Sequence, residues 1–136
     1  MTVRLEWDGA LRFQGTVDDS PIAMDGDAES ARSPVQMLST SLAACMAIDV
    51  VHILEKMRTP PTTLGMELTV QRAESDPRRV VSATMKFAVG GDVPDKNVQR
   101  ALDMSRETYC SVWHSLRRDI DLECTFEVHP VDRPTP

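Results

Sequence analysis

One long apolar segment constrains the fold of this chain more than any other feature. The residues of Val35–Leu54 are rich in Ala, Leu, Met, Ile and Val, and Ala, Leu and Met favour helix. Ser33-Pro34 is typical of a helix start, because a proline at the first helical position has no N–H to leave unpaired. Pro60-Pro61 prevents the helix from continuing. We therefore predict a single helix from Pro34 to about Arg58.

This helix is predicted to be buried rather than to span a membrane. Asp49 and His52 interrupt its apolar sequence, and a charge at mid-span is costly in lipid. Apolar residues occur on nearly all its sides, so other structure is expected to enclose it. A chain of 136 residues has the length of one domain and leaves little material to cover such a helix. A homodimer is therefore favoured.

Alternating apolar and polar residues predict strands on both sides of the long helix. The other predicted elements are a hairpin over 3–17, a third strand at 22–24, a second hairpin over 64–89, a helix over 94–109 and a last strand over 120–128. This order implies an α+β domain over 1–129, with one sheet face packed on helices and the other face polar. Residues 130–136 are expected to form a C-terminal tail.

Charge and terminal sequence narrow the class of protein further. The chain carries 15 basic and 21 acidic residues, for a net charge of −6, so nucleic acid is not an expected partner. The first ten residues are interrupted by charges and lack the apolar core of a secretory signal, which predicts a cytoplasmic protein with reduced thiols. No dinucleotide fingerprint, phosphate-binding loop or nucleophile elbow occurs.

The three cysteines differ in their predicted surroundings. Cys124 falls on the inward face of the last strand, where a free cysteine acts as a small apolar side chain. Cys45 lies in the middle of the long helix among small residues that supply no charge, so by itself it is predicted to be an inert core thiol. Asp49, one turn further on, would raise rather than lower its pKa.

The predicted position of the Cys110 side chain depends on where the second predicted helix ends. The apolar stripe of that helix includes Tyr109, and 100° per residue places Cys110 at the margin of the stripe. If the chain breaks near Tyr109 and a new helix starts toward Val112, Cys110 would lie at a helix N-terminus, where the dipole lowers a thiol pKa.

A metal site on the long helix is not expected. Cys45, Asp49 and His52 face one side of the helix, but the rise from Cys45 to His52 is about 10 Å, which is too far for both to bind one ion. The same distance argues against a nucleophile pair of Cys45 and His52. No CxxC or HxxxH pairing occurs elsewhere.

The segment Ser33–Arg58 with Cys45 at its centre, followed downstream by Tyr109-Cys110-Ser111-Val112, resembles the OsmC/Ohr superfamily. The resemblance covers residues 1–129 and includes the order of elements and the sequence separation of the two thiols. Within the superfamily, the sequence is most similar to the OsmC-like branch, whose biological role is poorly defined.

The resemblance implies an OsmC-like fold, with an antiparallel sheet and a long buried central helix in an intertwined homodimer. It also implies a thiol-dependent peroxidase that reduces organic hydroperoxides in oxidative stress defence. Cys45 would be the peroxidatic cysteine and Cys110 the resolving one, passing through a sulfenic acid to a disulfide. A dithiol of lipoyl type, or another small dithiol, would be the reductant. No metal or organic cofactor is implied.

One departure from the family pattern leaves two functions open. In the hydroperoxidases of the superfamily an arginine and a glutamate hold the peroxidatic thiolate, and this chain has Val35, followed by the neutral Gln36, at the glutamate's place. Arg12 and Arg32 are the candidates for the arginine. The thiol pair favours a peroxidase, whereas Val35 and Gln36 favour a non-peroxidatic dimer that binds a small ligand or senses redox state.

Overall fold

A computed structural model describes residues 1–130, and the chain divides into two compact units, Met1–Thr40 and Ser41–Pro136. The boundary falls within α1 (Pro34–Lys56), the long helix that the sequence predicts. Except for Pro130, the predicted C-terminal tail lies outside the described residues.

The first unit contains a three-stranded antiparallel sheet in the order β1 (Val3–Trp7), β2 (Arg12–Val17) and β3 (Ser20–Asp25). The predicted hairpin and third strand are both confirmed. In this register Trp7 lies opposite Phe13, and Phe13 lies opposite Met24, so the apolar side chains share one face. Gly15 is required on that face, because a Cβ there would lie 1.7 Å from the carbonyl oxygen of Arg4.

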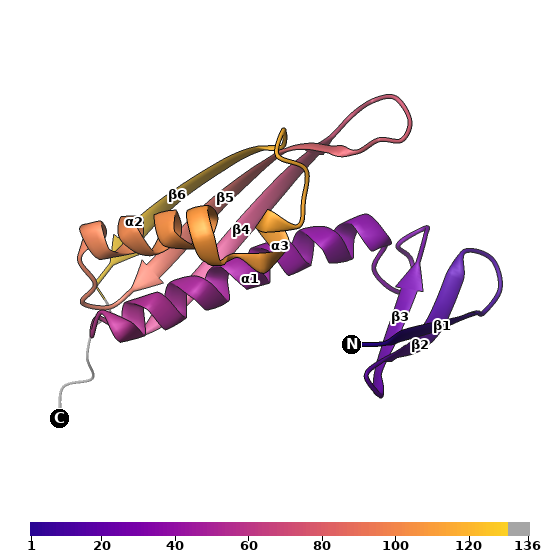
Figure 1. Cartoon of the computed structure of the whole chain (residues 1–136), viewed down its shortest axis with the longest axis horizontal. Coiled ribbons are helices and arrows are strands. Elements are labelled where there is room, and N and C mark those ends of the chain that lie inside the picture. Colours follow the sequence, from indigo (N-terminus) through magenta and orange to yellow (C-terminus); the bar gives the residue numbers. More distant parts are fainter. Residues whose placement is uncertain (131–136) are drawn as a thin grey trace. The chain divides into compact units, whose positions relative to one another are not determined.

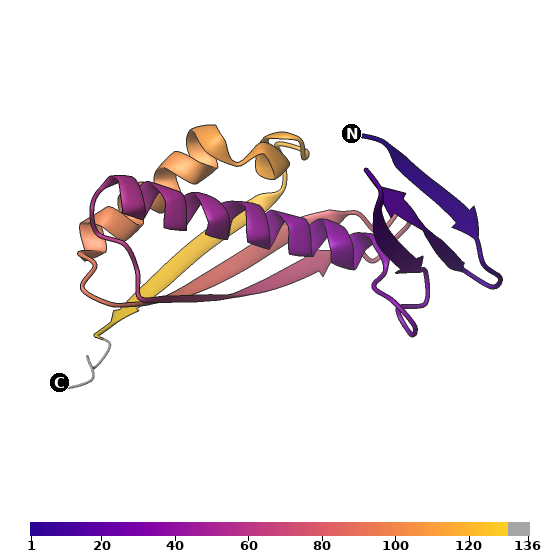
Figure 2. The ribbon, with the colours of Figure 1, turned by 90° about the horizontal axis from the view of Figure 1, so that it is seen from below.

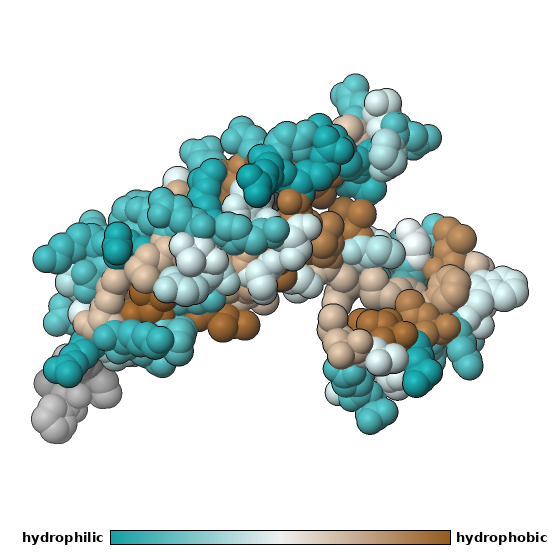
Figure 3. All heavy atoms as spheres, in the orientation of Figure 1, coloured by the Kyte–Doolittle hydropathy of each residue, from teal (hydrophilic) through white to brown (hydrophobic). Residues whose placement is uncertain are grey.

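The apolar face of this sheet is largely exposed. Trp7 is 69% exposed, and Leu5 and Phe13 are exposed as well, so apolar side chains appear at the surface of the first unit (Figure 3). The buried side chain of this unit is the polar Asp25. Three strands need a covered apolar face for stability, so this sheet requires packing that it does not find within its own unit.

Asp25 organises the polar loop between β3 and α1. Its carboxylate accepts hydrogen bonds of 2.9 Å from the backbone N–H groups of Asp27 and Ser30 and from the Ser30 hydroxyl. The hydrogen bonds from Ser30 and Asp27 lower the pKa of Asp25 to about 2. The carboxylate thus fixes the path of the chain just before α1.

A reciprocal pair of hydrogen bonds starts α1. The Gln36 backbone N–H donates to Ser33 Oγ at 3.2 Å, and the Ser33 backbone N–H donates to Gln36 Oε1 at 3.0 Å. This is a capping box, which pairs two N–H groups that have no partner within the helix. The predicted helix start is confirmed, and the neutral Gln36 has a structural role there.

We expect Ser33→Ala to lower the free energy of unfolding by about 1 kcal/mol, because one N–H group at the helix start loses its acceptor. Urea unfolding followed by circular dichroism measures the change. Arg100→Ala, an exposed substitution in the second helix, is the control and should change stability by less than about 0.5 kcal/mol. Equal effects of the two substitutions would contradict the cap.

The second unit contains a mixed sheet in the order β4 (Thr63–Arg72), β5 (Val80–Gly90) and β6 (Asp121–His129). β4 and β5 form the predicted antiparallel hairpin, but β6 pairs with β5 in parallel. The antiparallel sheet expected from the resemblance is therefore wrong at this strand. The reason is the connection from β5 to β6, which includes helices and returns the chain to the same end of the sheet.

The core of the second unit lies between this sheet and the helices on one of its faces (Figures 1 and 2). α1 buries Met46, Val50 and Leu54, while the central strand β5 buries Met85 and Val89. Cys124 on β6 lies opposite Met85 on β5. Its side chain packs against this core, on the inward face of the strand as predicted.

Within the second unit, the buried residues of α1 lie on one side of the helix. By length and composition alone this helix could cross a membrane, but its buried face belongs to the core of the second unit. Ile48, on the other side, is 67% exposed. Among the described residues of the second unit, the predicted enclosure of α1 on nearly all sides is thus not found.

A π-helical turn changes the end of the second helix. α2 (Asp95–Met104) continues into the π-helix η1 (Ser105–Tyr109), and the short helix α3 (Ser111–His114) follows. The Cys110 N–H donates to the Ser105 carbonyl five residues back, at 2.8 Å. This wider turn accommodates one extra residue, so Cys110 takes the place on the apolar stripe predicted for Tyr109. Tyr109 is 57% exposed instead.

Candidate functional site

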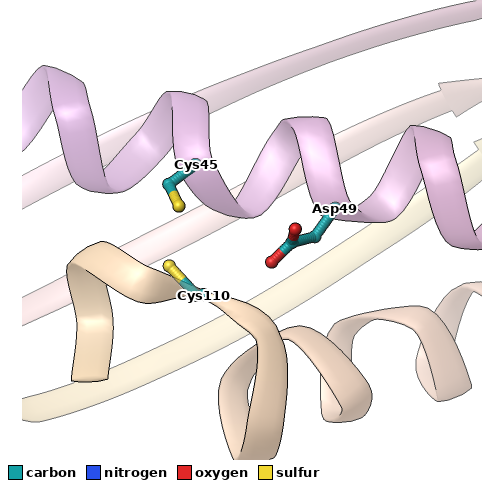
Figure 4. A group of neighbouring side chains, drawn as sticks. All are labelled: Cys45, Asp49 and Cys110. Carbon is teal, nitrogen blue, oxygen red and sulfur yellow. The ribbon is translucent and has the colours of Figure 1, made fainter.

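Cys45 and Cys110 meet inside the second unit. Cys45 lies in α1 and Cys110 lies between η1 and α3, and their sulfur atoms point toward one another (Figure 4). The two sulfur atoms and a carboxylate oxygen of Asp49 all lie within 4.8 Å of one another. The fold thus assembles the thiol pair that the resemblance implies from two distant segments.

The chain break inferred near Tyr109 exists and positions Cys110. Cys110 is the N-cap of α3, and its Sγ accepts a hydrogen bond from the Trp113 backbone N–H at 3.3 Å. Its side chain is fully buried, whereas Cys45 is half-buried. The more accessible thiol of the pair is therefore Cys45.

Asp49 completes the cluster from the same face of α1. Its Oδ2 accepts a hydrogen bond from the buried Ser105 hydroxyl at 2.8 Å. Ser105 is also the residue whose carbonyl accepts the π-type hydrogen bond from Cys110. The π-helical turn thus holds both the carboxylate of Asp49 and the backbone of Cys110.

The surroundings of Cys45 favour its thiolate. Burial opposes ionisation, but hydrogen bonds from the Val112 backbone N–H, the Ser111 hydroxyl and the Cys110 thiol outweigh it, so the pKa of Cys45 is lowered. The Ser111 Oγ lies 3.7 Å from the Cys45 sulfur. Asp49 acts in the opposite direction, as predicted. Cys45 is therefore not the inert thiol that the residues of its own helix alone predict.

Cys110 shows the opposite behaviour. Burial raises the pKa of Cys110 to about 11, although the Trp113 N–H works against this, and the neighbouring Cys45 adds to the rise. The predicted lowering of this pKa is wrong, because desolvation outweighs the helix terminus. The first turn of α3 instead lowers the pKa of Cys45 through Val112 and Ser111.

We expect the two thiols to be alkylated in different pH ranges. Iodoacetamide reacts with thiolates, so Cys45 should react below the pH at which an ordinary cysteine does, whereas Cys110 should stay protonated until the pH approaches about 11. Peptide mapping by mass spectrometry after short pulses at increasing pH measures both rates. Alkylation of Cys110 before Cys45 near neutral pH would contradict this order.

A hollow of about 330 Å³ lies beside the cluster. Its lining includes Asp49 and His52 from α1, with Met104 and Tyr109 from the segment that precedes Cys110. The remaining lining residues, Ile53, Lys56 and Met57, make the hollow partly apolar and partly charged. A small organic molecule can therefore reach the region next to Asp49.

Arg12 and Arg32 belong to the first unit, whereas Cys45, Asp49 and Cys110 belong to the second. The guanidinium of Arg12 donates to the Asp8 carbonyl at 3.4 Å, and that of Arg32 donates to the Ala28 carbonyl at 3.4 Å. Both side chains are exposed. The thiolate-stabilising role of either arginine stays a prediction.

Sequence reasoning missed three groups of this site. Ser105, Ser111 and the Val112 backbone N–H all contact the cluster, yet none stands out in the sequence. A possible signal is the Cys110-Ser111 pair at the start of a new helix, where both the side chain and the free N–H groups can reach a neighbouring sulfur. The partner of Ser105 depends on packing between two helices, which no local pattern encodes.

The geometry also brings together a different set of metal-ligating atoms from the one considered in the sequence. Cys110, rather than His52, joins Cys45 and Asp49. Because Cys110 approaches from another helix, the rise along α1 no longer limits the arrangement.

Comparisons with known proteins identify the family of this chain. The family of OsmC-like proteins matches residues 26–125. Protein YhfA of Escherichia coli K12 is 37% identical over 131 residues, which cover 94% of this chain and 98% of that protein.

Solved structures share the fold. A hypothetical protein from Aquifex aeolicus superposes with a TM-score of 0.88 at 27% identity, covering 96% of this chain and 97% of that one. An organic hydroperoxide resistance protein OsmC from Legionella pneumophila superposes with a TM-score of 0.71 at 13% identity, covering 94% of this chain and 98% of that one. The chain belongs to the OsmC-like protein family.

Proposed function

We propose that this protein is a thiol-dependent peroxidase that reduces organic hydroperoxides and serves in oxidative stress defence. The observation that carries the proposal is the unequal thiol pair. Cys45 is accessible and has a lowered pKa, while Cys110 is buried, protonated and within reach of it. A peroxidatic cysteine needs the first set of properties, and a resolving cysteine that must wait for oxidation needs the second.

In the first step, the Cys45 thiolate attacks one oxygen of the hydroperoxide O–O bond. That bond breaks, Cys45 becomes a sulfenic acid, and the other oxygen leaves as an alcohol after taking up a proton. Ser111 and the Val112 N–H stabilise the attacking thiolate beforehand. The hollow beside Asp49 offers space for the organic part of the substrate.

In the second step, Cys110 loses its proton and its sulfur attacks the Cys45 sulfur. The sulfenic hydroxyl leaves with that proton as water, and a disulfide forms. The two sulfur atoms start within 4.8 Å, so only a modest movement closes the bond of about 2 Å. The high pKa of Cys110 keeps it from competing as the first nucleophile.

A dithiol, of lipoyl type or another small class, completes the cycle by reducing the disulfide through a mixed disulfide. A cytoplasmic location suits this cycle, because the compartment keeps resting thiols reduced. The Legionella pneumophila protein of the same fold is named an organic hydroperoxide resistance protein, which is consistent with such chemistry.

A second function, a non-peroxidatic dimer that binds a small ligand or senses redox state, is favoured by the charges around Cys45. Val35 supplies no carboxylate at the helix start, and the Gln36 amide is used by the helix cap. Within the second unit, the negative charge of Asp49 acts to raise the pKa of Cys45. A thiol pair with these neighbouring charges is suited to reacting slowly and to reporting the redox state, rather than to reducing hydroperoxides rapidly.

Stoichiometric oxidation distinguishes the two functions. Reduced protein is mixed with a slight molar excess of cumene hydroperoxide, and free thiols and intact mass are followed with time. A peroxidase is expected to lose two thiols rapidly and to lose the mass of two hydrogens on disulfide formation. Oxidation no faster than that of free cysteine would overturn the peroxidase and leave the sensing or binding dimer.

We further propose that the protein is a homodimer, the intertwined form that the family resemblance implies. Support comes from the exposed apolar face of the β1–β3 sheet and from Ile48 on the uncovered side of α1. We expect light scattering after size exclusion to give about twice the chain mass of 15.1 kDa. A monomer at micromolar concentration would contradict this proposal.

A further inference from the structure

We propose that the reduced cluster of Cys45, Cys110 and Asp49 is a binding site for one thiophilic divalent cation, with Zn²⁺ as the best match. Two sulfur atoms and one carboxylate oxygen lie within 4.8 Å of one another. Ligand atoms around a tetrahedral zinc ion are about 3.5–3.8 Å apart, as follows from bond lengths of about 2.0–2.3 Å. Small side-chain adjustments therefore bring all three atoms into contact with one ion.

The chemistry of the ligands selects the class of metal. Two thiolates with one carboxylate favour zinc over Mg²⁺ or Ca²⁺, which prefer all-oxygen sites. A dication also offsets the like negative charges of two thiolates and one carboxylate held within 4.8 Å of one another. Among the ion pairs formed by residues 1–130, none includes Asp49.

Groups behind the ligands are already arranged to hold them. The Ser105 hydroxyl donates to Asp49 Oδ2 at 2.8 Å, and the Trp113 N–H donates to Cys110 Sγ at 3.3 Å. Hydrogen bonds of this kind fix the orientation of metal ligands in proteins. Ser105 itself is fully buried, so this support does not depend on a mobile surface side chain.

Three protein ligands leave a fourth coordination position. Asp49, one of the three ligands, lines the hollow of about 330 Å³. Three protein ligands with one exchangeable position are typical of reactive rather than purely structural zinc sites. A water molecule or another small ligand would occupy this fourth position.

Zinc binding and disulfide formation exclude one another, because a Cys45–Cys110 disulfide leaves neither sulfur as a thiolate. On binding, the ion displaces the Cys110 proton, and the Cys45 proton where one is present, into solvent. Affinity is therefore expected to rise with pH. The inference goes beyond the proposed peroxidase and does not rest on it, since it requires only reduced thiols in this geometry.

The test uses the reduced full chain, stripped with a chelator and kept in a phosphine reductant. Zinc chloride alone is added in competition with a chromophoric chelator, and native mass spectrometry counts bound ions. We expect one zinc per chain, and near-ultraviolet sulfur-to-metal absorption when Co²⁺ replaces zinc. After the reductant is removed, oxidation of the wild-type chain to the disulfide with diamide is expected to release the ion, which tests the site without any substitution.

Matched variants locate the site. Cys110→Ser and Asp49→Asn are expected to weaken zinc binding strongly, Ser105→Ala by about 10–100-fold, and Cys124→Ser not at all. Circular dichroism before zinc addition establishes that each variant is folded. Wild-type affinity in Cys110→Ser, or no zinc bound by the reduced wild type, would overturn the inference. The zinc titration contains no hydroperoxide, so it tests the zinc site separately from the peroxidase. A chain that binds zinc but does not react with hydroperoxide would overturn the proposed peroxidase and leave the zinc site unaffected.

Discussion

Cys45→Ser is expected to abolish the rapid loss of thiols caused by cumene hydroperoxide, whereas Cys110→Ser should lose one thiol and form no intrachain disulfide. The reason is the division of properties between the two residues. Cys45 is accessible and has the lowered pKa, while burial raises the pKa of Cys110 to about 11. Free-thiol assays and intact mass measure both outcomes, with the Cys110→Ser product gaining one or more oxygen atoms.

Cys124→Ser is the matched control, because Cys124 packs against the core on β6, and burial raises its pKa. This variant should react as the wild type does. Rapid oxidation that survives Cys45→Ser but is lost in Cys110→Ser would reverse the roles assigned to the two thiols.

Leu54→Ala is expected to lower the free energy of unfolding by about 3 kcal/mol, the largest effect on stability that we foresee from one substitution in α1. Leu54 is completely buried in the core of the second unit, so the substitution loses apolar burial and leaves a cavity. Urea unfolding, monitored by circular dichroism, measures the change.

Ile48→Ala makes a similar truncation on the exposed side of the same helix. At low protein concentration, where any dimer dissociates, it should lower the free energy of unfolding by less than about 1 kcal/mol. If both substitutions cost the same under those conditions, the assignment of the buried face of α1 is wrong. An effect of Ile48→Ala that grows with protein concentration would support a second copy on this side.

Local sequence patterns determined most of the secondary structure of this protein. Ser33, Pro34 and Gln36 fix the start of α1 through contacts within a few residues, and Pro60-Pro61 prevents its continuation. Strict alternation placed Cys124 on the inward face of β6 because strand side chains alternate with a period of two. Such features depend on neighbours along the chain, so the sequence is sufficient to predict them.

Identification of the candidate site depended partly on the family resemblance and partly on the fold. The residues around Cys45 and Cys110 resemble the family closely enough to nominate the pair, but their own surroundings in the sequence did not. Cys45 lacks a local group that lowers its pKa, and the groups that do so, Ser111 and Val112, arrive from a segment far along the chain.

Tertiary structure alone decided three features. The helical connection made β6 parallel to β5, against expectation. One extra residue in the π turn exchanged the places of Tyr109 and Cys110, burying the thiol and exposing the ring. Burial then raised the pKa of Cys110, while the start of α3 lowered that of Cys45. The parallel strand follows from the path of the connection, the exchange of Tyr109 and Cys110 from the π-type hydrogen bond, and the two pKa shifts from desolvation and hydrogen bonding between segments distant in sequence. None of these is encoded by the local periodicity of apolar residues.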